Sequence, residues 1–456
     1  MSGNGRRLLA CIALSLLLCV AHVRGSTVLV LACLAGFMVL ITADCVTDNT
    51  FPTLLFFLPW SPILRLTPDS FSFYTVALML VCVISVLKKK FRFKRYHLII
   101  GLLLLPLTML SKLLDGSMIE FDYIAFLLLI LVFPVVKEEW LAAKYDFFQI
   151  VIFFSLGIIL SALAALSLTS SANIAHFIHV DAYLTIVRRC GFYGDANFYT
   201  AQITAALGGC LMELLKEKKP GHMILLFAAI VFLLYCGFLS GSKSFVLILL
   251  ALLLIWIIGL FRLQGRIVFK VILIIAGAVV ASFIATSVLF KDLLAMMDVR
   301  FSFSSDMSQF TTGRTDVWSL YLNEFLGDWK MLFLGKGFTN VLIGEKYTHN
   351  TLLQMIFQVG LLGTPVLLGW SAFFFADTPE EEKKKKLQFI PASLLVIGAI
   401  SPWLAIDALF FDEFFLMQMY VYLGCRRIVR GDGPRVPHIA GSINTEPERP
   451  GLEGEV

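Results

Sequence analysis

Long apolar segments follow one another along almost the whole chain. A helix that crosses the hydrocarbon core of a bilayer, roughly 30 Å thick, needs about 20 mostly apolar residues. About fourteen segments come close to this length. They cover residues 8–23, 27–43, 51–66, 71–87, 97–114, 121–136, 147–169, 197–215, 222–240, 244–261, 267–290, 350–375, 388–406 and 409–425. The sequence therefore predicts an all-α, polytopic transmembrane bundle of about 12 to 14 spans.

The composition excludes a water-soluble protein of this size. Apolar residues make up 59% of the chain and charged residues 15%, and the mean hydropathy is +0.86. The net charge of +5 is modest and does not indicate a nucleic-acid partner. We expect one membrane domain over residues 1–430. The proline-containing polar tail 431–456 is expected to be a disordered cytoplasmic end.

Two of the predicted spans are unusual. Arg6 and Arg7 followed by an apolar run resemble a signal peptide, but a second apolar run begins almost at once at Thr27. We therefore expect an uncleaved first span. The segment 51–66 contains three prolines and is the weakest span, with a re-entrant segment as the alternative.

Short clusters of Lys and Arg separate the apolar segments and give the orientation. Cytoplasmic loops are enriched in these residues, and counting spans between the clusters keeps all of them on one side. The clusters are residues 88–95, 216–219, 262–266, 383–386 and 426–430. The C-terminus is then cytoplasmic, and the large loop 291–349 is extracytoplasmic.

The loop 291–349 is long compared with the other connections, and loops of this length are often functional. Its many aromatic residues, and the helical spacing of apolar residues over 316–325, predict an amphipathic helix that lies on the membrane surface or caps the bundle. An interfacial lid without chemistry is the alternative. Nine scattered cysteines, of which only Cys190 is expected in an external loop, indicate neither a disulfide nor a metal site.

The loop ends in His349-Asn350, and nine residues later the next span contains Gly360 and Gly363 in a Gly-x-x-Gly pattern. This arrangement resembles the signature of the O-antigen ligase and O-antigen polymerase superfamily of bacterial membrane glycosyltransferases. Three further segments are similar to that family in the expected order, and together the motifs cover a family-like core, residues 189–363. These segments are 189–197, 239–244 and 313–318, the last containing Trp318.

The resemblance implies an enzyme of the bacterial plasma membrane that acts in surface polysaccharide assembly. It would transfer or polymerise glycan from undecaprenyl-pyrophosphate-linked donors at the outer face, without metal or cofactor. Implied partners are this donor, a glycan or lipid-glycan acceptor, membrane lipid, and a chain-length regulator or flippase. Polymerase is slightly favoured over ligase because such chains are commoner in capsule and exopolysaccharide systems. A flippase or transporter is the alternative, although the chain shows no internal repeat and gathers its charge at one face.

A pyrophosphate leaving group gains negative charge as the glycosidic bond breaks, so fixed cations should line the site. The candidates are Arg189, Lys243 and Arg314, and Arg314 is also a catalytic candidate. Arg188 is an equal alternative to Arg189, except that Arg189 keeps the family's spacing to Gly191. The family usually carries Arg where this chain has Lys243, which replaces a planar fork with a point charge. The alternatives are a Lys243 that snorkels from a helix end and an Arg314 that pairs with a neighbouring carboxylate.

His349 is the candidate general base, because an imidazole with a pKa of about 6.5 accepts a proton from a hydroxyl near neutral pH. The alternative is an interfacial His that caps the next helix. Asn350 is a substrate-binding candidate and can also be the N-cap of that helix, which would fix His349 above the membrane. Gly360 and Gly363 are expected to let another helix approach closely.

Acidic and amide side chains complete the candidate set. Asp195 and Asn197 can bind sugar hydroxyls, or Asp195 can instead cap the span that begins at Asn197. Asp407, Asp412 and Glu413 lie near the last external turn, where interfacial charges and ion coupling are both possible interpretations.

Overall fold

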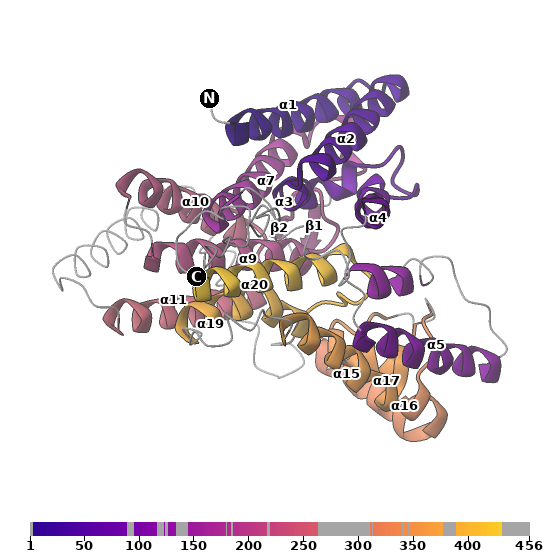
Figure 1. Cartoon of the computed structure of the whole chain (residues 1–456). Helices are drawn as coiled ribbons and strands as arrows, with labels where there is room; N and C mark the ends of the chain where they lie inside the picture. The colour runs from indigo at the N-terminus through magenta and orange to yellow at the C-terminus, as the bar shows by residue number, and fades with distance from the viewer. Residues whose placement is uncertain are drawn as a thin grey trace, which may run out of the picture.

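The computed structural model is an all-α polytopic bundle with one short β-hairpin (Figure 1). The predicted fold class is confirmed. The structure describes residues 3–88, 95–115, 123, 126–133, 145–178, 180–183, 186–216, 219–262, 311, 313–339, 342–344, 346–376 and 389–430. The predicted span 267–290, parts of 121–136, the first part of the large loop, the cluster 383–386 and the tail 431–456 lie outside these residues.

The first half of the chain forms mostly long helices. They are α1 (Gly3–Val23), α2 (Thr27–Thr47), α3 (Thr50–Phe57), the 3-10 helix η1 (Leu58–Ile63), α4 (Phe73–Leu87), α5 (Arg95–Asp115), α7 (Phe147–Leu168) and the short α8 (Ala172–Ala175). The hairpin of β1 (Val180–Tyr183) and β2 (Ile186–Arg189) follows, with Asp181 opposite Arg188 in its antiparallel register.

The second half returns to helices. They are α9 (Ala196–Lys216), α10 (Pro220–Leu239), α11 (Lys243–Arg262), α15 (Arg314–Gly327), α16 (Trp329–Leu334), α17 (Thr351–Ala376), α19 (Phe389–Ile400), the 3-10 helix η2 (Ser401–Leu404) and α20 (Asp412–Arg430).

Seven helices in the described part of the chain are long and apolar enough to cross a membrane, which makes this a multi-pass membrane protein. They are α1, α2, α7, α9, α10, α11 and the first 21 residues of α17, and the shorter apolar helices α4, α5 and α19–η2 accompany them. The helix ends lie within a few residues of the predicted ends in most cases. This agreement follows from the length that a hydrocarbon layer imposes on each apolar segment.

The weak third segment, 51–66, forms the short helices α3 and η1. Every residue of α3 is buried, and the chain tightens into η1, where Pro59 and Pro62 remove backbone donors. A broken helix is tolerated at this depth because protein, rather than lipid, surrounds it. Asp48, just before α3, pairs with Lys88 at the end of α4, whereas the carbonyl of Ile63 at the end of η1 accepts from the ring of His22 at the end of α1. The segment therefore crosses the bundle as a broken helix, and the re-entrant alternative does not describe it.

Contacts between helix ends divide the bundle into two faces. On the first, here called the basic face, the beginnings of α1 and α7 meet through an Asn4–Gln149 hydrogen bond of 2.9 Å, and Lys88 pairs with Asp48. The ring of His222 stacks on Phe148 there at 4.0 Å between centroids. On the opposite face, here called the site face, lie the hairpin, α15 and the turn before α20. The side of a membrane on which each face lies stays a prediction from the charge clusters.

Helix α9 is the centre of the bundle and packs against α7, α10, α11 and α19. A Cβ atom at Gly208 would lie 2.4 Å from the carbonyl oxygen of Leu394, so the backbones of α9 and α19 touch. The hydroxyl of Thr204 donates to the carbonyl of Gly398 at 2.8 Å across the same contact. This close packing fixes the start of α9 on the site face.

The helix predicted over 316–325 is present as α15, which forms a small hydrophobic core with α16 and α17. Val317, Tyr321 and Phe325 recur at helical spacing and pack with Met331 and Phe357. Helix α5 lies alongside α16 and α17 (Figure 1). The described part of the large loop is therefore an ordered cap on this side of the bundle.

Candidate functional site

The turn that contains His349 is organised around one buried carboxylate. Asp407, 5% exposed, accepts a hydrogen bond from the hydroxyl of Thr348. Its Oδ2 atom accepts from the backbone N–H of His349 at 2.9 Å, and its Oδ1 atom accepts from the N–H of Asn350 at 3.4 Å. Three consecutive residues of one segment therefore depend on a side chain 58 positions away in sequence.

His349 adopts a left-handed backbone conformation with φ of 48°. A non-glycine residue pays roughly 1–2 kcal/mol in this region, so surrounding contacts must hold it there. The carboxylate of Asp407 supplies such a contact through the His349 N–H. The imidazole is half-buried and lies near the ring of Tyr347, with 6.4 Å between ring centroids.

Helix α15 holds the segment that leads to His349. The indole N–H of Trp318 donates to the carbonyl of Thr348 at 3.0 Å, and the hydroxyl of Tyr321 donates to the carbonyl of Lys346 at 2.8 Å. The same hydroxyl accepts from the N–H of Ile343 at 3.4 Å. Trp318, part of the predicted motif, is thus a support for the His349 turn.

Asn350 separates His349 from the beginning of helix α17 at Thr351. The side-chain oxygen of Asn350 accepts from the N–H groups of Leu352 and Leu353 at 2.9 and 3.2 Å, which is the predicted N-cap. The hydroxyl of Thr351, the first residue of α17, donates to the carbonyl of Ile406 at 2.8 Å. The beginning of α17 and the turn before α20 are therefore one rigid unit.

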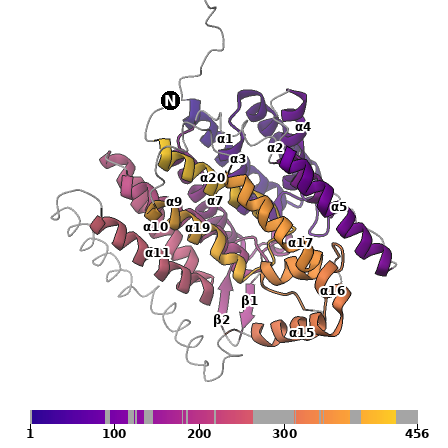
Figure 2. The ribbon, with the colours of Figure 1, turned by 60° about the horizontal axis from the view of Figure 1, so that its bottom comes forward.

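Arg314 is the first residue of α15 and follows Gly313, whose φ of 77° permits the sharp approach to the helix. Burial lowers the pKa of Arg314, and the nearby charge of Arg188 lowers it further, while Asp195 and Asp407 act in the opposite direction. These interactions bring together β2, the start of α9, α15 and the Asp407 turn. The hairpin and α15 lie at the same end of the bundle (Figure 2).

Asp195 and Asn197 join the beginnings of α9 and α11. Asp195 Oδ1 accepts from the backbone N–H of Asn197 at 2.5 Å and from its side-chain amide at 2.9 Å, so Asp195 caps α9. The amide oxygen of Asn197 accepts from the hydroxyls of Ser242 and Ser244 at 3.0 and 3.3 Å. Lys243 stands between these serines, half-buried, as the first residue of α11. Two motifs that are separate in the sequence thus share a hydrogen-bond network.

The two adjacent arginines of β2 have different surroundings. The guanidinium of Arg188 donates to the carbonyl of Ser240 at 2.9 Å. Its charge also contributes to the lowered pKa of Arg314. Arg189 is exposed and borders a groove that Cys190 and Tyr199 also line. Neighbouring residues of a strand point to opposite sides, which explains the separation. The motif spacing did not favour Arg188, but Arg188 is the arginine whose charge, like those of Asp195 and Asp407, acts on Arg314.

The two motif glycines of α17 also differ. Gly360 has a non-helical conformation with φ of 67°, and a Cβ atom there would lie 2.2 Å from the carbonyl oxygen of Phe333. It therefore allows the backbone of α16 to touch α17. At Gly363 the nearest atoms belong to Val359 of the same helix, so the close approach of another helix occurs at Gly360.

The sequence left Asp407 with two interpretations and did not predict its role as the acceptor that holds the His349 turn. The available signal was an acidic residue in an external turn directly before the last span. Its partners could not be identified because they belong to the large loop. Among the residues that the structure describes, no group of three His, Cys, Asp or Glu side chains could hold a metal ion.

Comparison with known proteins supplies no relative: no family model matches the chain, and no curated protein matches it significantly.

Proposed function

We propose that this protein is a membrane glycosyltransferase of the O-antigen ligase or polymerase type. It transfers or polymerises glycan from an undecaprenyl-pyrophosphate-linked donor at the outer face of the bacterial plasma membrane. The observation that carries the proposal is the grouping of Arg314 and Arg188 with the Asp407-held turn of His349 on one face of the bundle. The motif resemblance described above provides the reaction class.

The two arginines favour an anionic ligand. Burial removes water from Arg314, the nearby carboxylate of Asp195 attracts its guanidinium group, and the like charge of Arg188 repels it. An anion bound to these arginines would replace the hydration that Arg314 has lost. A pyrophosphate suits these groups because a guanidinium can donate two parallel hydrogen bonds to a phosphate. The charge that develops on the leaving group would be stabilised in the same way.

His349 is proposed to remove the proton of the acceptor hydroxyl as that oxygen attacks the anomeric carbon. The bond from the anomeric carbon to the pyrophosphate oxygen breaks, and the electron pair remains on the lipid pyrophosphate. Asp407 bonds the backbone of His349 rather than its imidazole, so it positions the base and leaves the ring nitrogens available. Asn197 and the serines near Lys243 are candidates for binding sugar hydroxyls.

The test uses purified protein in nanodiscs with a defined undecaprenyl-pyrophosphate-linked repeat unit. His349→Asn is preferable to an alanine variant because Asn tolerates the left-handed conformation while lacking the imidazole. We expect His349→Asn and Arg314→Gln to reduce transfer by at least about 100-fold, as expected for loss of general-base or electrostatic catalysis.

Matched controls use exposed residues of the same types. His176 follows α8, and Arg24 lies in the turn between α1 and α2, both on the site face. His176→Asn and Arg24→Gln should retain normal transfer. Full activity in both His349→Asn and Arg314→Gln would refute the assignment of the site. A ladder of products on lipid identifies a polymerase, and a requirement for a second acceptor identifies a ligase.

A further inference from the structure

Helix α16 lies at the depth of a membrane span rather than above it. Its Phe333 carbonyl touches Gly360, nine positions after the beginning of α17. At a rise of about 1.5 Å per residue, this contact lies roughly 13 Å along a helix that is itself a candidate span. Phe333, near the end of α16, is therefore level with the hydrocarbon region that surrounds α17.

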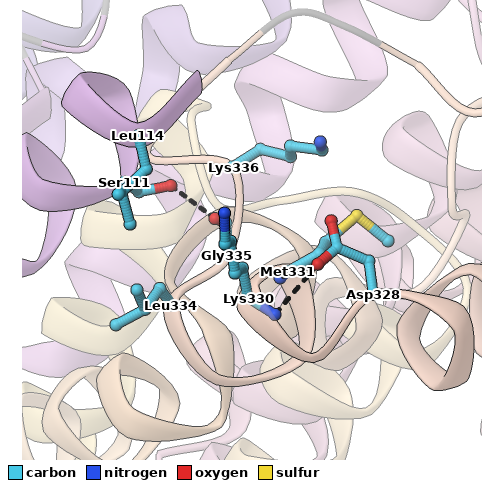
Figure 3. Close-up of a pocket in the computed structure, with 8 residues that line it drawn as sticks. All are labelled: Ser111, Leu114, Asp328, Lys330, Met331, Leu334, Gly335 and Lys336. Atoms are coloured by element: carbon cyan, nitrogen blue, oxygen red, sulfur yellow. Dashed lines mark hydrogen bonds between the residues drawn. The ribbon is translucent and has the colours of Figure 1, made fainter. Parts of the chain in front are cut away.

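A second span gives the same depth. The hydroxyl of Ser111, near the end of α5, donates to the carbonyl of Gly335 at 2.5 Å. A Cβ atom at Gly337 would lie 2.7 Å from the carbonyl oxygen of Thr108, one turn further into α5. Figure 3 shows this junction, where Leu114 of α5 faces the segment that ends α16. The α16 segment thus packs inside the limits of both helices.

One side of this segment is apolar and uncovered by the described protein. Leu326 is 81% exposed, Trp329 66% and Phe333 43%, whereas Met331 on the other side of α16 is buried. Trp329 and Phe333 are one helical turn apart and share a face. We call these three exposed residues the apolar edge. Large exposed apolar side chains gathered in this way usually mark a surface that another apolar medium covers.

The apolar edge continues the lipid-facing surface of neighbouring spans. Phe333 adjoins α17 just before Leu361 and Leu362, which are 41% and 52% exposed. Lys330, exposed beside Trp329, adds a cation next to an aromatic residue, a combination that is common where helices meet lipid headgroups. Continuity with these spans and the depth of α16 both favour lipid as the covering medium.

We infer that α16 and the end of α15 are inserted into the membrane leaflet on the site face, with phospholipid covering Leu326, Trp329 and Phe333. This insertion fixes the height of α15 relative to the lipid surface. Because Arg314 begins α15 and Trp318 supports the His349 turn, the lipid leaflet sets the level of the candidate site. The inference concerns membrane contact and holds whatever reaction the site performs.

The first experiment measures tryptophan fluorescence in nanodiscs made with phosphatidylcholine brominated along its acyl chains. The contribution of Trp329 is obtained by subtracting the signal of Trp329→Phe from that of the native protein. We expect this contribution to be quenched by brominated lipid and to resist aqueous iodide. Trp60→Phe is the control, because Trp60 is fully buried and its loss should leave the lipid-quenched intensity unchanged.

The second experiment compares two cysteines on α15 with a membrane-impermeant maleimide, using the native protein as the blank for its own cysteines. Asn323 is exposed on the same helix as Leu326. Leu326→Cys should react at least about tenfold more slowly than Asn323→Cys in nanodiscs, because lipid suppresses thiolate formation. The two variants should react equally after unfolding in detergent.

Two results would overturn the inference. Quenching of Trp329 by iodide but not by brominated lipid, with equal labelling of both cysteines, would place the apolar edge in water. Resistance of Trp329 to both quenchers would mean that protein covers the edge, either a second copy of this chain or another subunit.

Discussion

Replacing Asp407 tests whether its carboxylate holds the His349 turn. In Asp407→Ala the N–H of His349 loses its acceptor, and a buried unpaired donor costs about 1–3 kcal/mol. The left-handed conformation of His349, which costs roughly 1–2 kcal/mol, favours local opening in both proteins and so does not add to the difference between them. The change of about 1–3 kcal/mol corresponds to roughly 5-fold to 160-fold faster local opening.

Asp407→Asn should be much milder. Its amide oxygen can keep the bond to the His349 N–H, while its NH₂ group donates to the hydroxyl of Thr348, which can act as donor or acceptor. The charge and the 3.4 Å hydrogen bond from the Asn350 N–H are lost, and we expect a local change of about 1 kcal/mol. The comparison therefore separates hydrogen-bond geometry from charge.

The assay is hydrogen–deuterium exchange of peptides that cover residues 346–354, read by mass spectrometry in nanodiscs. Glu324→Ala, an exposed carboxylate on α15, is the control and should leave these peptides unchanged. Unchanged exchange in Asp407→Ala would refute the role of this carboxylate. Equal damage from the Ala and Asn variants would show that charge, rather than acceptor geometry, holds the turn.

Two further predictions concern stability, measured by thermal unfolding in detergent. Gly360→Ala places a Cβ atom 2.2 Å from the carbonyl oxygen of Phe333 at a φ of 67°, so it should destabilise the fold by at least about 2 kcal/mol. A Cβ atom at Gly369 meets nothing within 4 Å, so Gly369→Ala should be neutral or stabilising. Equal effects would contradict the close contact. Burial raises the pKa of Tyr321, so its contribution is present below about pH 10 and is lost as pH rises through the folded pKa. Tyr321→Phe should therefore start less stable and lose less stability between about pH 9 and pH 11; an unchanged slope would contradict this.

Much of the fold could be predicted because membrane insertion is governed by local composition. An apolar segment of about 20 residues has few alternatives to a spanning helix, whatever its neighbours are. The prolines of the third segment likewise indicated a weak span, which the structure has as α3 and η1. The cap of α17 by Asn350 is a local feature of the same kind.

The site could be predicted only in part. The motifs pointed to Arg314, His349, Asp195 and Asn197 as candidates. Motif spacing favoured Arg189, whereas Arg188 is the arginine whose charge acts on Arg314. A strand turns successive side chains to opposite sides, so the choice depends on how the hairpin packs.

The amino-acid sequence by itself determined the helical class and the approximate ends of the spans, because each depends on a continuous stretch of chain and its solvent. Only the tertiary structure decided that Asp407 holds His349, that Gly360 touches α16 and that Arg188 joins Arg314. These contacts join residues from separate helices, and their free energy exists only when those helices are packed together.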